Sequence, residues 1–312
     1  MLDHRERKRK RLSGRKPEWL RSGIPSGENY VRLKKMLKER NLHTICEEGK
    51  CPNLSECWGG GTATFMLLGD ICTRGCRFCN VMTRKRGAEV DTEEPYKVAE
   101  AAVAMDLDYV VITSVDRDDL PDGGSNHFAD TIRKVYELSD HSIMVEVLTP
   151  DFRGNRDEIA TVVQAKPTVF SHNMETVRSL TPKVRDPRCS FDQSLEVLRY
   201  AKEVDPDTIT KSSMMLGLGE TFDDVVAAMD DLREAGVDIL TLGQYLQPTT
   251  KHVLVSEFVP PSRFDELAEE GRKRGFVFVA AGPLVRSSYR AGELFIKNFV
   301  EQRDRERQET HS

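Results

Sequence analysis

The stretch "YVVITSVDRDDLPDGGSNHFADTIRKVYELSDHSIMVEVLT", residues 109–149, decides the fold of this chain. A β-branched run over 109–115 leads into a loop, an amphipathic segment over 125–138 and a second apolar run over 143–149. β-Branched runs favour strands, and apolar residues spaced by three and four favour a helix. Two strands joined through a helix run parallel with a right-handed crossover. The stretch therefore predicts one βαβ unit.

The same alternation extends to both sides of this unit. Six strands are expected, at 63–68, 109–115, 143–149, 168–173, 208–218 and 238–246. Helices are expected between them, at 94–105, 125–138, 156–165, 190–204 and 221–236, the last of which ends at Gly236. Strict alternation of this kind fits either a doubly wound sheet or a barrel.

Polar residues and glycine favour the barrel, because they recur where the strands end: Asp70, Asp116, Asn173, Gly217 and Gln244. The carboxyl ends of the strands form the active face of a βα-barrel. Six units are fewer than a closed eight, so the fold class predicted is α/β, a partial (βα)6 TIM-like barrel. It would occupy residues 61–247, with residues 1–60 as an N-terminal extension and residues 248–312 as a C-terminal one.

The composition is that of an ordinary globular protein: 312 residues, 38% hydrophobic and 31% charged. The net charge of −5 provides no global basic field for nucleic acid. No apolar run approaches the roughly 18 residues of a membrane span. The basic stretch "MLDHRERKRKRLSGRK" lacks the apolar core of a secretory signal, so a solvated arm is expected. We therefore predict a protein without a membrane or nucleic-acid partner. A cytoplasmic location is also expected, because clustered cysteines in a large chain without a signal indicate a reducing compartment. A monomer is expected because no extended apolar surface helix stands out.

The seven cysteines indicate metal ligation, since six of them fall between residues 46 and 79 of a large chain. The loop "GDICTRGCRFCNVM", residues 69–82, places Cys72, Cys76 and Cys79 directly after the first strand. Thiolates are soft ligands for zinc or iron–sulfur clusters. Three of them on a four-iron cluster leave one iron open to another ligand, whereas structural zinc needs four protein ligands. A zinc loop remains the alternative.

A second triplet lies upstream, in "CEEGKCPNLSEC", residues 46–57. Cys46, Cys51 and Cys57 again lack a fourth partner. Their spacing leaves three interpretations open: a separate three-thiolate site, a zinc knot completed by His43, or extra ligands for the first cluster.

The loop Cys72-x-x-x-Cys76-x-Phe78-Cys79 resembles the signature of the radical S-adenosylmethionine superfamily. This resemblance implies a 4Fe–4S cluster whose open iron binds the amine and carboxylate of S-adenosyl-L-methionine, with Phe78 near the adenine. It also implies a partial six-stranded barrel. The second triplet, with its flanking "HTICEEGKCPN" and "ECW", resembles the auxiliary-cluster motif of the lipoyl synthase family. The likeness continues through "DRDDLPDGG", "HNMETV", "MLGLGET", "GQYLQPT" and "AGPLVRSSYRAG".

The second resemblance implies a second 4Fe–4S cluster, held by the upstream triplet and by Ser288 of the sequence Arg-Ser-Ser-Tyr, with Ser287 as the alternative. The implied activity is that of a sulfurtransferase. It would insert two sulfur atoms by radical chemistry at carbons six and eight of a protein-bound N6-octanoyl-lysine. The auxiliary cluster would be sacrificed as the sulfur source and lipoyl-lysine formed. The implied partners are an octanoylated lipoyl carrier domain, an electron donor such as ferredoxin or flavodoxin, and an iron–sulfur carrier.

Further cofactor contacts are expected at strand ends. Asn173 and Glu175 are placed to hydrogen-bond the ribose or methionine part of S-adenosylmethionine, although Asn173 could instead cap a helix. Lys211 in the fifth strand could meet the methionine carboxylate, as could Arg185 or Arg188. The aspartate-rich loop 116–124 fails the order of an EF-hand and predicts a structured turn.

Two other functions are compatible with parts of the pattern. A methylthiotransferase would also be a two-cluster radical enzyme, but it would be expected to bring an RNA-binding appendage, and the C-terminal extension is short and not strongly basic. A zinc-binding module without enzymatic activity predicts zinc and no cleavage of S-adenosylmethionine.

Overall fold

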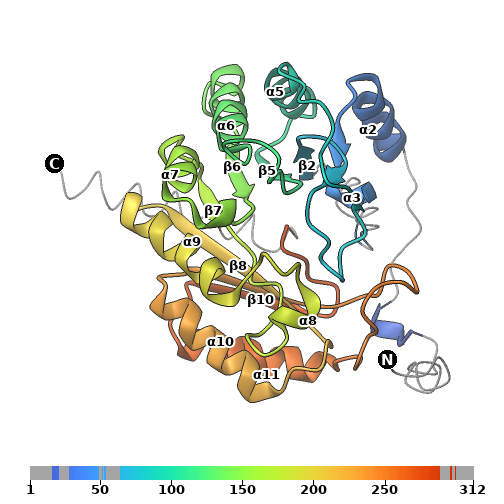
Figure 1. Cartoon of the computed structure of the whole chain (residues 1–312), viewed down its shortest axis with the longest axis vertical. Helices are drawn as coiled ribbons and strands as arrows, with labels where there is room; N and C mark the ends of the chain where they lie inside the picture. Colours follow the sequence, from blue (N-terminus) through green and yellow to red (C-terminus); the bar gives the residue numbers. More distant parts are fainter. Residues whose placement is uncertain are drawn as a thin grey trace.

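The computed structural model describes residues 16–20, 28–48, 51, 53, 64–288, 296 and 299 (Figure 1). Its main sheet has the order β1-β2-β5-β6-β7-β8-β9-β10. The strands are β1 (His43–Thr44), β2 (Thr64–Leu67), β5 (Tyr109–Ser114), β6 (Met144–Leu148), β7 (Val169–Ser171), β8 (Ile209–Leu216), β9 (Ile239–Gln244) and β10 (Phe278–Gly282). All neighbours pair in parallel except β1 with β2. The six predicted strands, β2 and β5 to β9, are confirmed as a partial α/β barrel.

Helices follow the strands and cover the outside of the curved sheet (Figure 1). They are α5 (Glu94–Ala104), α6 (Ser125–Ser139), α7 (Arg156–Gln164), α8 (Thr181–Val184), α9 (Phe191–Val204), α10 (Phe222–Glu234) and α11 (Pro261–Lys273). Local sequence sets their ends: the Ser190 hydroxyl accepts a hydrogen bond from the amide of Gln193 at the start of α9. Gly236 follows α10 with a φ of 80°, which glycine adopts without strain. No helix in the described part of the chain could cross a membrane.

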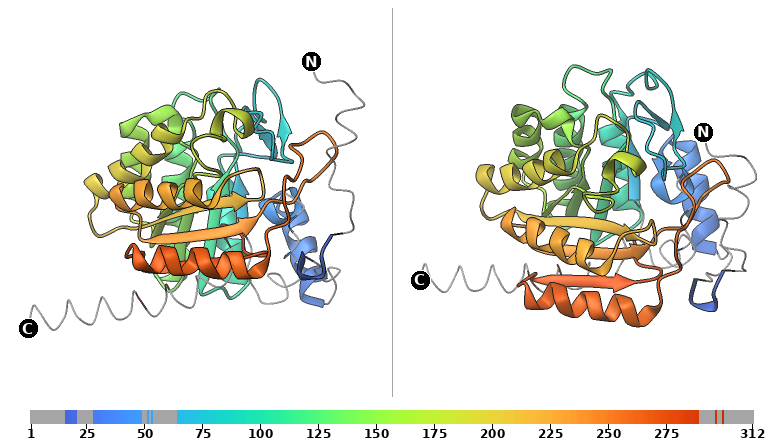
Figure 2. Two further views of the ribbon diagram at one scale, coloured as in Figure 1. Left: turned by 90° about the horizontal axis from the view of Figure 1, so that it is seen from below. Right: turned by 60° about the horizontal axis from the view of Figure 1, so that its bottom comes forward.

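Both extensions add to the sheet. The C-terminal one supplies α11 and β10, and β10 pairs with β9 along its whole length (Figure 2). The N-terminal one supplies η1 (Glu18–Leu20), α2 (Glu28–Glu39), β1 and α3 (Ile45–Glu48). Neither β1 nor β10 was expected. β1 has only two residues, which is too short for an alternation of apolar and polar residues to be detected. The sequence of β10, "FVAAG", is rich in small residues, which are depleted in typical strands.

The floor of the barrel contains a buried ion pair. Lys211 Nζ lies 2.8 Å and 2.9 Å from the two carboxylate oxygens of Glu146. Tyr109 and Ser171 donate further hydrogen bonds to the same carboxylate, at 2.6 Å and 3.1 Å. A carboxylate and an ammonium are tolerated at such depth only when paired and hydrogen-bonded in this way. The apolar side chain of Ile296 packs in the neighbouring cluster.

Candidate active site

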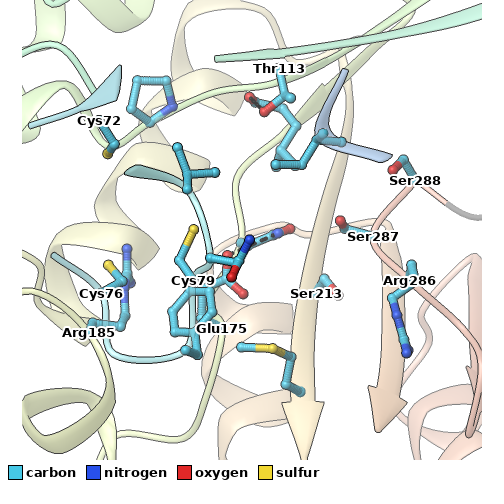
Figure 3. Close-up of a pocket in the computed structure, with 18 of the residues that line it drawn as sticks. Cys72, Cys76, Cys79, Thr113, Glu175, Arg185, Ser213, Arg286, Ser287 and Ser288 are labelled. Carbon is cyan, nitrogen blue, oxygen red and sulfur yellow. Dashed lines mark hydrogen bonds between the residues drawn. The ribbon is translucent and has the colours of Figure 1, made fainter. Parts of the chain in front are cut away.

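A cavity of about 360 Å³ opens at the carboxyl ends of the barrel strands (Figure 3). All six cysteines that the structure describes line it: Cys46, Cys51, Cys72, Cys76, Cys79 and Cys189. In Figure 3, Cys72, Cys76 and Cys79 lie on one side of the cavity, and Arg286, Ser287 and Ser288 lie on the other. The first cysteine triplet and the sequence that bears Ser287 and Ser288 are more than 200 residues apart in the chain, yet both line the same cavity.

Cys72 is the last residue of β3 (Ile71–Cys72), and Cys76 and Cys79 follow on the loop that leads to β4 (Met82–Thr83). The Cys79 amide donates to the Cys76 carbonyl at 3.1 Å, which closes a tight turn. Two backbone amides point at sulfur: that of Arg74 lies 3.4 Å from Cys72 Sγ, and that of Asp186 lies 3.4 Å from Cys76 Sγ. Amides directed at sulfur stabilise thiolate, the form that binds metal.

Without a bound cation, burial keeps these thiols protonated. It raises the pKa of Cys79 to about 11 and, together with the Asp116 carboxylate, that of Cys72 to about 12. A hydrogen bond to Cys189 and burial also raise the pKa of Cys76. Binding of a metal centre must therefore displace protons, as is general for thiolate ligands.

The donor set is chemically suited to an iron–sulfur cluster. Soft sulfur donors line one common cavity, and three thiols on one loop leave an iron of a four-iron cluster open to another ligand. Cys72, Cys76 and Cys79 would hold this cluster.

A buried arginine fixes the cysteine loop to the barrel. The Arg74 side chain is 2% exposed and makes a bidentate contact with Asp118, at 2.8 Å for both pairs of atoms. Its Nη1 lies 2.7 Å from Asp151 and 3.3 Å from Cys189 Sγ. Burial favours the neutral form of Asp151, but the hydrogen bond and charge of Arg74 outweigh it and hold the pKa of that carboxyl below its usual range.

The aspartate-rich loop is a structured turn, as expected from its sequence. Asp118 accepts hydrogen bonds from Arg74, and Asp119 pairs with Arg117 at 2.8 Å. Asp122 accepts a hydrogen bond from the amide of Gly124, just before α6. Asp116 faces the cavity, and burial raises its pKa to about 6 although the charge of Arg74 opposes this.

Three of the residues expected near S-adenosylmethionine line the cavity: Phe78, Asn173 and Glu175. Asn173 Nδ2 donates to Glu175 Oε1 at 3.2 Å, and Glu175 has a φ of 66°, in the left-handed region that is uncommon for residues other than glycine. Burial raises the pKa of the Glu175 carboxyl.

Arg185 also lines the cavity and is 7% exposed. Its Nη1 donates to Ser194 at 2.7 Å, but its buried Nε has no hydrogen-bond partner among the residues that the structure describes. An unsatisfied guanidinium donor beside a cavity is suited to a carboxylate ligand. The other alternative, Arg188, is already engaged by Asp186 and Asp118.

Lys211 lies elsewhere. It is the third residue of the eight-residue strand β8, in the ion pair with Glu146, and is not among the residues that line the cavity. The sequence identified the strand correctly. Whether a side chain of that strand lies near the cavity or near the barrel floor depends on where the neighbouring strands begin and end, which the sequence of one strand does not show. Of the residues expected to meet the methionine carboxylate, Arg185 lines the cavity and Lys211 does not.

The second triplet is described in part, because Cys57 lies outside the described residues. Tyr289 of the sequence Arg-Ser-Ser-Tyr lies outside them as well. Cys46 is buried and Cys51 half-buried. Asn53 Nδ2 donates to the carbonyl oxygen of Leu284 at 2.6 Å, so the N-terminal extension touches the C-terminal one. Burial raises the pKa of Cys51, against the opposing charge of the nearby Arg286, whose own pKa burial lowers.

Gly243 sets the position of the segment that bears Ser287 and Ser288. A Cβ atom at this residue of β9 would overlap the carbonyl oxygen of Val285. We expect Gly243→Ala to displace the segment and to lower the free energy of unfolding by about 1–3 kcal/mol, measured in urea. Its sheet partner provides the control, since a Cβ at Gly282 would lie 3.3 Å from Cγ2 of Val285. Equal losses for Gly282→Ala and Gly243→Ala would contradict this explanation.

His172 makes stability depend on pH. Burial, assisted by the charge of Arg185, lowers its pKa to about 4, and its ring bonds Thr149 O and Ser194 Oγ at 2.9 Å. Because the unfolded state binds the proton more tightly, this contribution is complete above about pH 6.5 and is lost as the pH falls towards 4. We expect wild type to lose about 2 kcal/mol more than His172→Gln between about pH 7 and pH 5 in urea unfolding. If the free energy of unfolding of wild type and of His172→Gln changed equally with pH, this explanation would be wrong.

Two parts of the site had no local signal in the sequence. Arg74 meets Asp151 across 77 residues, and Asn53 meets Leu284 across 231. In the sequence, an arginine two residues from a cysteine is compatible with a surface position. The position of Arg74 within a short loop of three cysteines was the one signal that could have suggested a buried carboxylate partner.

Comparison with known proteins agrees with this site. The model of the Radical SAM superfamily matches residues 66–244, and the model described as the N-terminal domain of lipoyl synthase matches residues 2–51. Membership of this superfamily implies S-adenosylmethionine and a 4Fe–4S cluster. A solved structure, the FeFe-hydrogenase maturase HydG from Carboxydothermus hydrogenoformans, has a TM-score of 0.53 at 14% identity, with 87% of this chain and 78% of that one covered. This likeness concerns the fold alone.

Two curated relatives share much more sequence. Lipoyl synthase of Anaeromyxobacter dehalogenans (strain 2CP-C) is 54% identical over 296 residues, covering 95% of this chain and 100% of the relative. Mitochondrial lipoyl synthase of Homo sapiens is 54% identical over 294 residues, covering 93% and 79%. Lipoyl synthases are sulfur-inserting enzymes that act on lipoyl carrier proteins. At this identity and coverage, the chain belongs to the lipoyl synthase family of radical S-adenosylmethionine enzymes.

Proposed function

We propose that this enzyme inserts sulfur at carbons six and eight of an octanoyl-lysine on a carrier domain, with a second 4Fe–4S cluster as the sulfur source. Cys46, Cys51, Cys57 and Ser288 would hold that cluster. The observation that supports this most is the single cavity lined by the first triplet, by Cys46 and Cys51, and by Ser287 and Ser288. The contact of Asn53 with Leu284 brings the two extensions together at the same place.

The bound groups would supply one-electron chemistry at unactivated carbon and the sulfur atoms themselves. The residues of the chain would bind and orient. Arg185 Nε offers a donor to the carboxylate of S-adenosylmethionine, and Asn173 and Glu175 offer hydrogen bonds to its ribose or amine. Phe78 provides an aromatic face beside the cysteine loop.

Serine is a harder and weaker ligand for iron than cysteine, which suits a cluster that is dismantled during turnover. Ser287 and Ser288 both line the cavity, so the pair offers a matched comparison. We expect Ser288→Ala to lose sulfur insertion and Ser287→Ala to retain most of it. The reverse result would transfer the ligand role to Ser287.

The decisive test offers an octanoyl-lysine peptide, S-adenosylmethionine and dithionite to the anaerobically reconstituted enzyme. About two 5′-deoxyadenosines per lipoyl-lysine are expected, one for each carbon. The variant with Cys46, Cys51 and Cys57 all replaced by alanine should still release deoxyadenosine but form no thiolated product. Deoxyadenosine without thiolated product from the wild type would refute the sulfur-insertion assignment and would favour another radical enzyme, such as a methylthiotransferase.

We also propose that extensions at 1–60 and 248–312 flank a barrel at 61–247. Both extensions contribute strands to the sheet. A ferredoxin or flavodoxin as electron donor, an iron–sulfur carrier, a monomeric state and a cytoplasmic location remain predictions. Names of the curated relatives include both bacterial and mitochondrial proteins.

A further inference from the structure

Exposed cations without a carboxylate partner gather around the first cysteine loop. Six such side chains, called the loop cations below, are Arg77, Arg84, Lys85, Arg86, Lys183 and Lys251. Within the described residues none of them makes an ion pair, whereas most other exposed lysines and arginines of the barrel do, for example Arg133, Lys134 and Arg156. Glu89 is an exposed carboxylate on the same segment. This local excess of positive charge contrasts with a net charge of −5 for the chain.

Hydrogen bonds connect the segments that bear the loop cations with one another and with the cysteine loop. The amide of Arg84 donates to the Cys72 carbonyl at 3.0 Å, and the guanidinium of Arg77 donates to the Lys183 carbonyl at 3.0 Å. Lys251 precedes His252, whose Nε2 lies 2.8 Å from the Cys79 carbonyl. Figure 2 shows the three segments, near residues 80, 183 and 251, side by side at one end of the barrel.

The loop cations lie on the outer side of the loop. Cys72, Cys76, Phe78 and Cys79 line the cavity, but none of the six cations does. The side chains of Arg84, Lys85 and Arg86 make no hydrogen bond or ion pair in the part of the chain that the structure describes, so local structure does not account for them. A substrate carrier would have to reach the cavity, whereas an electron carrier needs only close approach to the cysteine sulfurs.

We propose that the loop cations are the docking surface for an acidic, low-potential one-electron carrier protein of the flavodoxin or ferredoxin class. This inference rests on the proposed function, because it assumes a cluster on Cys72, Cys76 and Cys79. The docked carrier would be oxidised by one electron, which a cluster held by Cys72, Cys76 and Cys79 would accept; no covalent bond would form or break. Complementary charge raises the rate of encounter and fixes the orientation of the two proteins.

The test compares the reconstituted wild type with Arg84→Glu/Lys85→Glu/Arg86→Glu. Binding of a flavodoxin is measured by titration calorimetry at low and at roughly 0.15 M salt, since exposed charges are screened beyond about 8 Å at the higher concentration. We expect the variant to bind on the order of tenfold more weakly at low salt and to lose most of the salt dependence. The control, Arg133→Glu/Lys134→Glu/Arg156→Glu, makes the same charge change on α6 and α7 and should bind as the wild type does.

A second readout separates docking from chemistry. Release of 5′-deoxyadenosine is measured with reduced flavodoxin and, separately, with dithionite, a small reductant that needs no docking surface. We expect the loop variant to be slow with flavodoxin and normal with dithionite. Unchanged flavodoxin binding, or an equal loss in the control variant, would overturn the proposal.

The remaining outcomes are equally distinct. Suppose that the loop variant, reduced by dithionite, modifies a short octanoyl-lysine peptide normally but fails on a whole octanoylated carrier domain. The surface then belongs to the substrate carrier, and our assignment is wrong. If the wild type releases no deoxyadenosine even with dithionite, the proposed function fails. The flavodoxin titration still decides whether the surface binds an acidic partner.

Discussion

Replacing Cys72, Cys76 and Cys79 together with alanine is expected to abolish release of 5′-deoxyadenosine and to remove one of the two proposed clusters. The iron content of anaerobically reconstituted protein should fall from roughly eight to roughly four per chain, with acid-labile sulfide falling in parallel. The physical reason is the donor set: these three thiols line one side of the cavity, and in the wild type backbone amides direct two of their sulfurs.

Cys189→Ala is the matched control for this experiment. Its thiol lines the same cavity and contacts Arg74, but it belongs to neither triplet. We expect this variant to keep its iron and sulfide. A triple variant that retained the full iron content, or a wild type loaded with zinc and free of sulfide, would contradict the two-cluster assignment.

Replacing Arg74 with methionine should lower the free energy of unfolding strongly. The guanidinium contacts Asp118 and Asp151, with Asp116 at 3.4 Å, and its side chain is almost fully buried. Removing one partner of a buried charge network leaves the others uncompensated, at a cost of about 3–5 kcal/mol. Urea unfolding of the iron-free protein measures this loss without a contribution from bound clusters.

The same variant makes a pH-dependent prediction. Arg74 holds the pKa of Asp151 below its usual range, so the stabilisation is present above about pH 4 and is lost as the pH falls further. The difference in the free energy of unfolding between wild type and Arg74→Met should therefore become smaller as the pH falls below about 4. Arg117→Met is the control, because Arg117 is 3% exposed but pairs with Asp119 alone among the described carboxylates. An equal loss in both variants would show that burial, rather than the carboxylate cluster, explains the effect.

The amino-acid sequence by itself determined the features that depend on short separations along the chain. The alternation of β-branched runs with amphipathic segments identified all six barrel strands. The spacing of Cys72, Cys76 and Cys79 identified a three-thiolate loop, because its chemistry requires neighbours on one loop. The position of Asn173 and Glu175 at the cavity could be predicted for a similar reason: polar residues at the end of a parallel strand face the active side of a barrel.

Only the tertiary structure decided what depends on contacts between distant segments. Sequence periodicity identified the strand of Lys211 but not its depth, and the side chain pairs with Glu146 in the barrel floor. The partners of Arg74 come from two other loops, and the meeting of Asn53 with Leu284 joins the two extensions. Such contacts are set by the packing of whole strands and helices, and no local pattern of residue types specifies them.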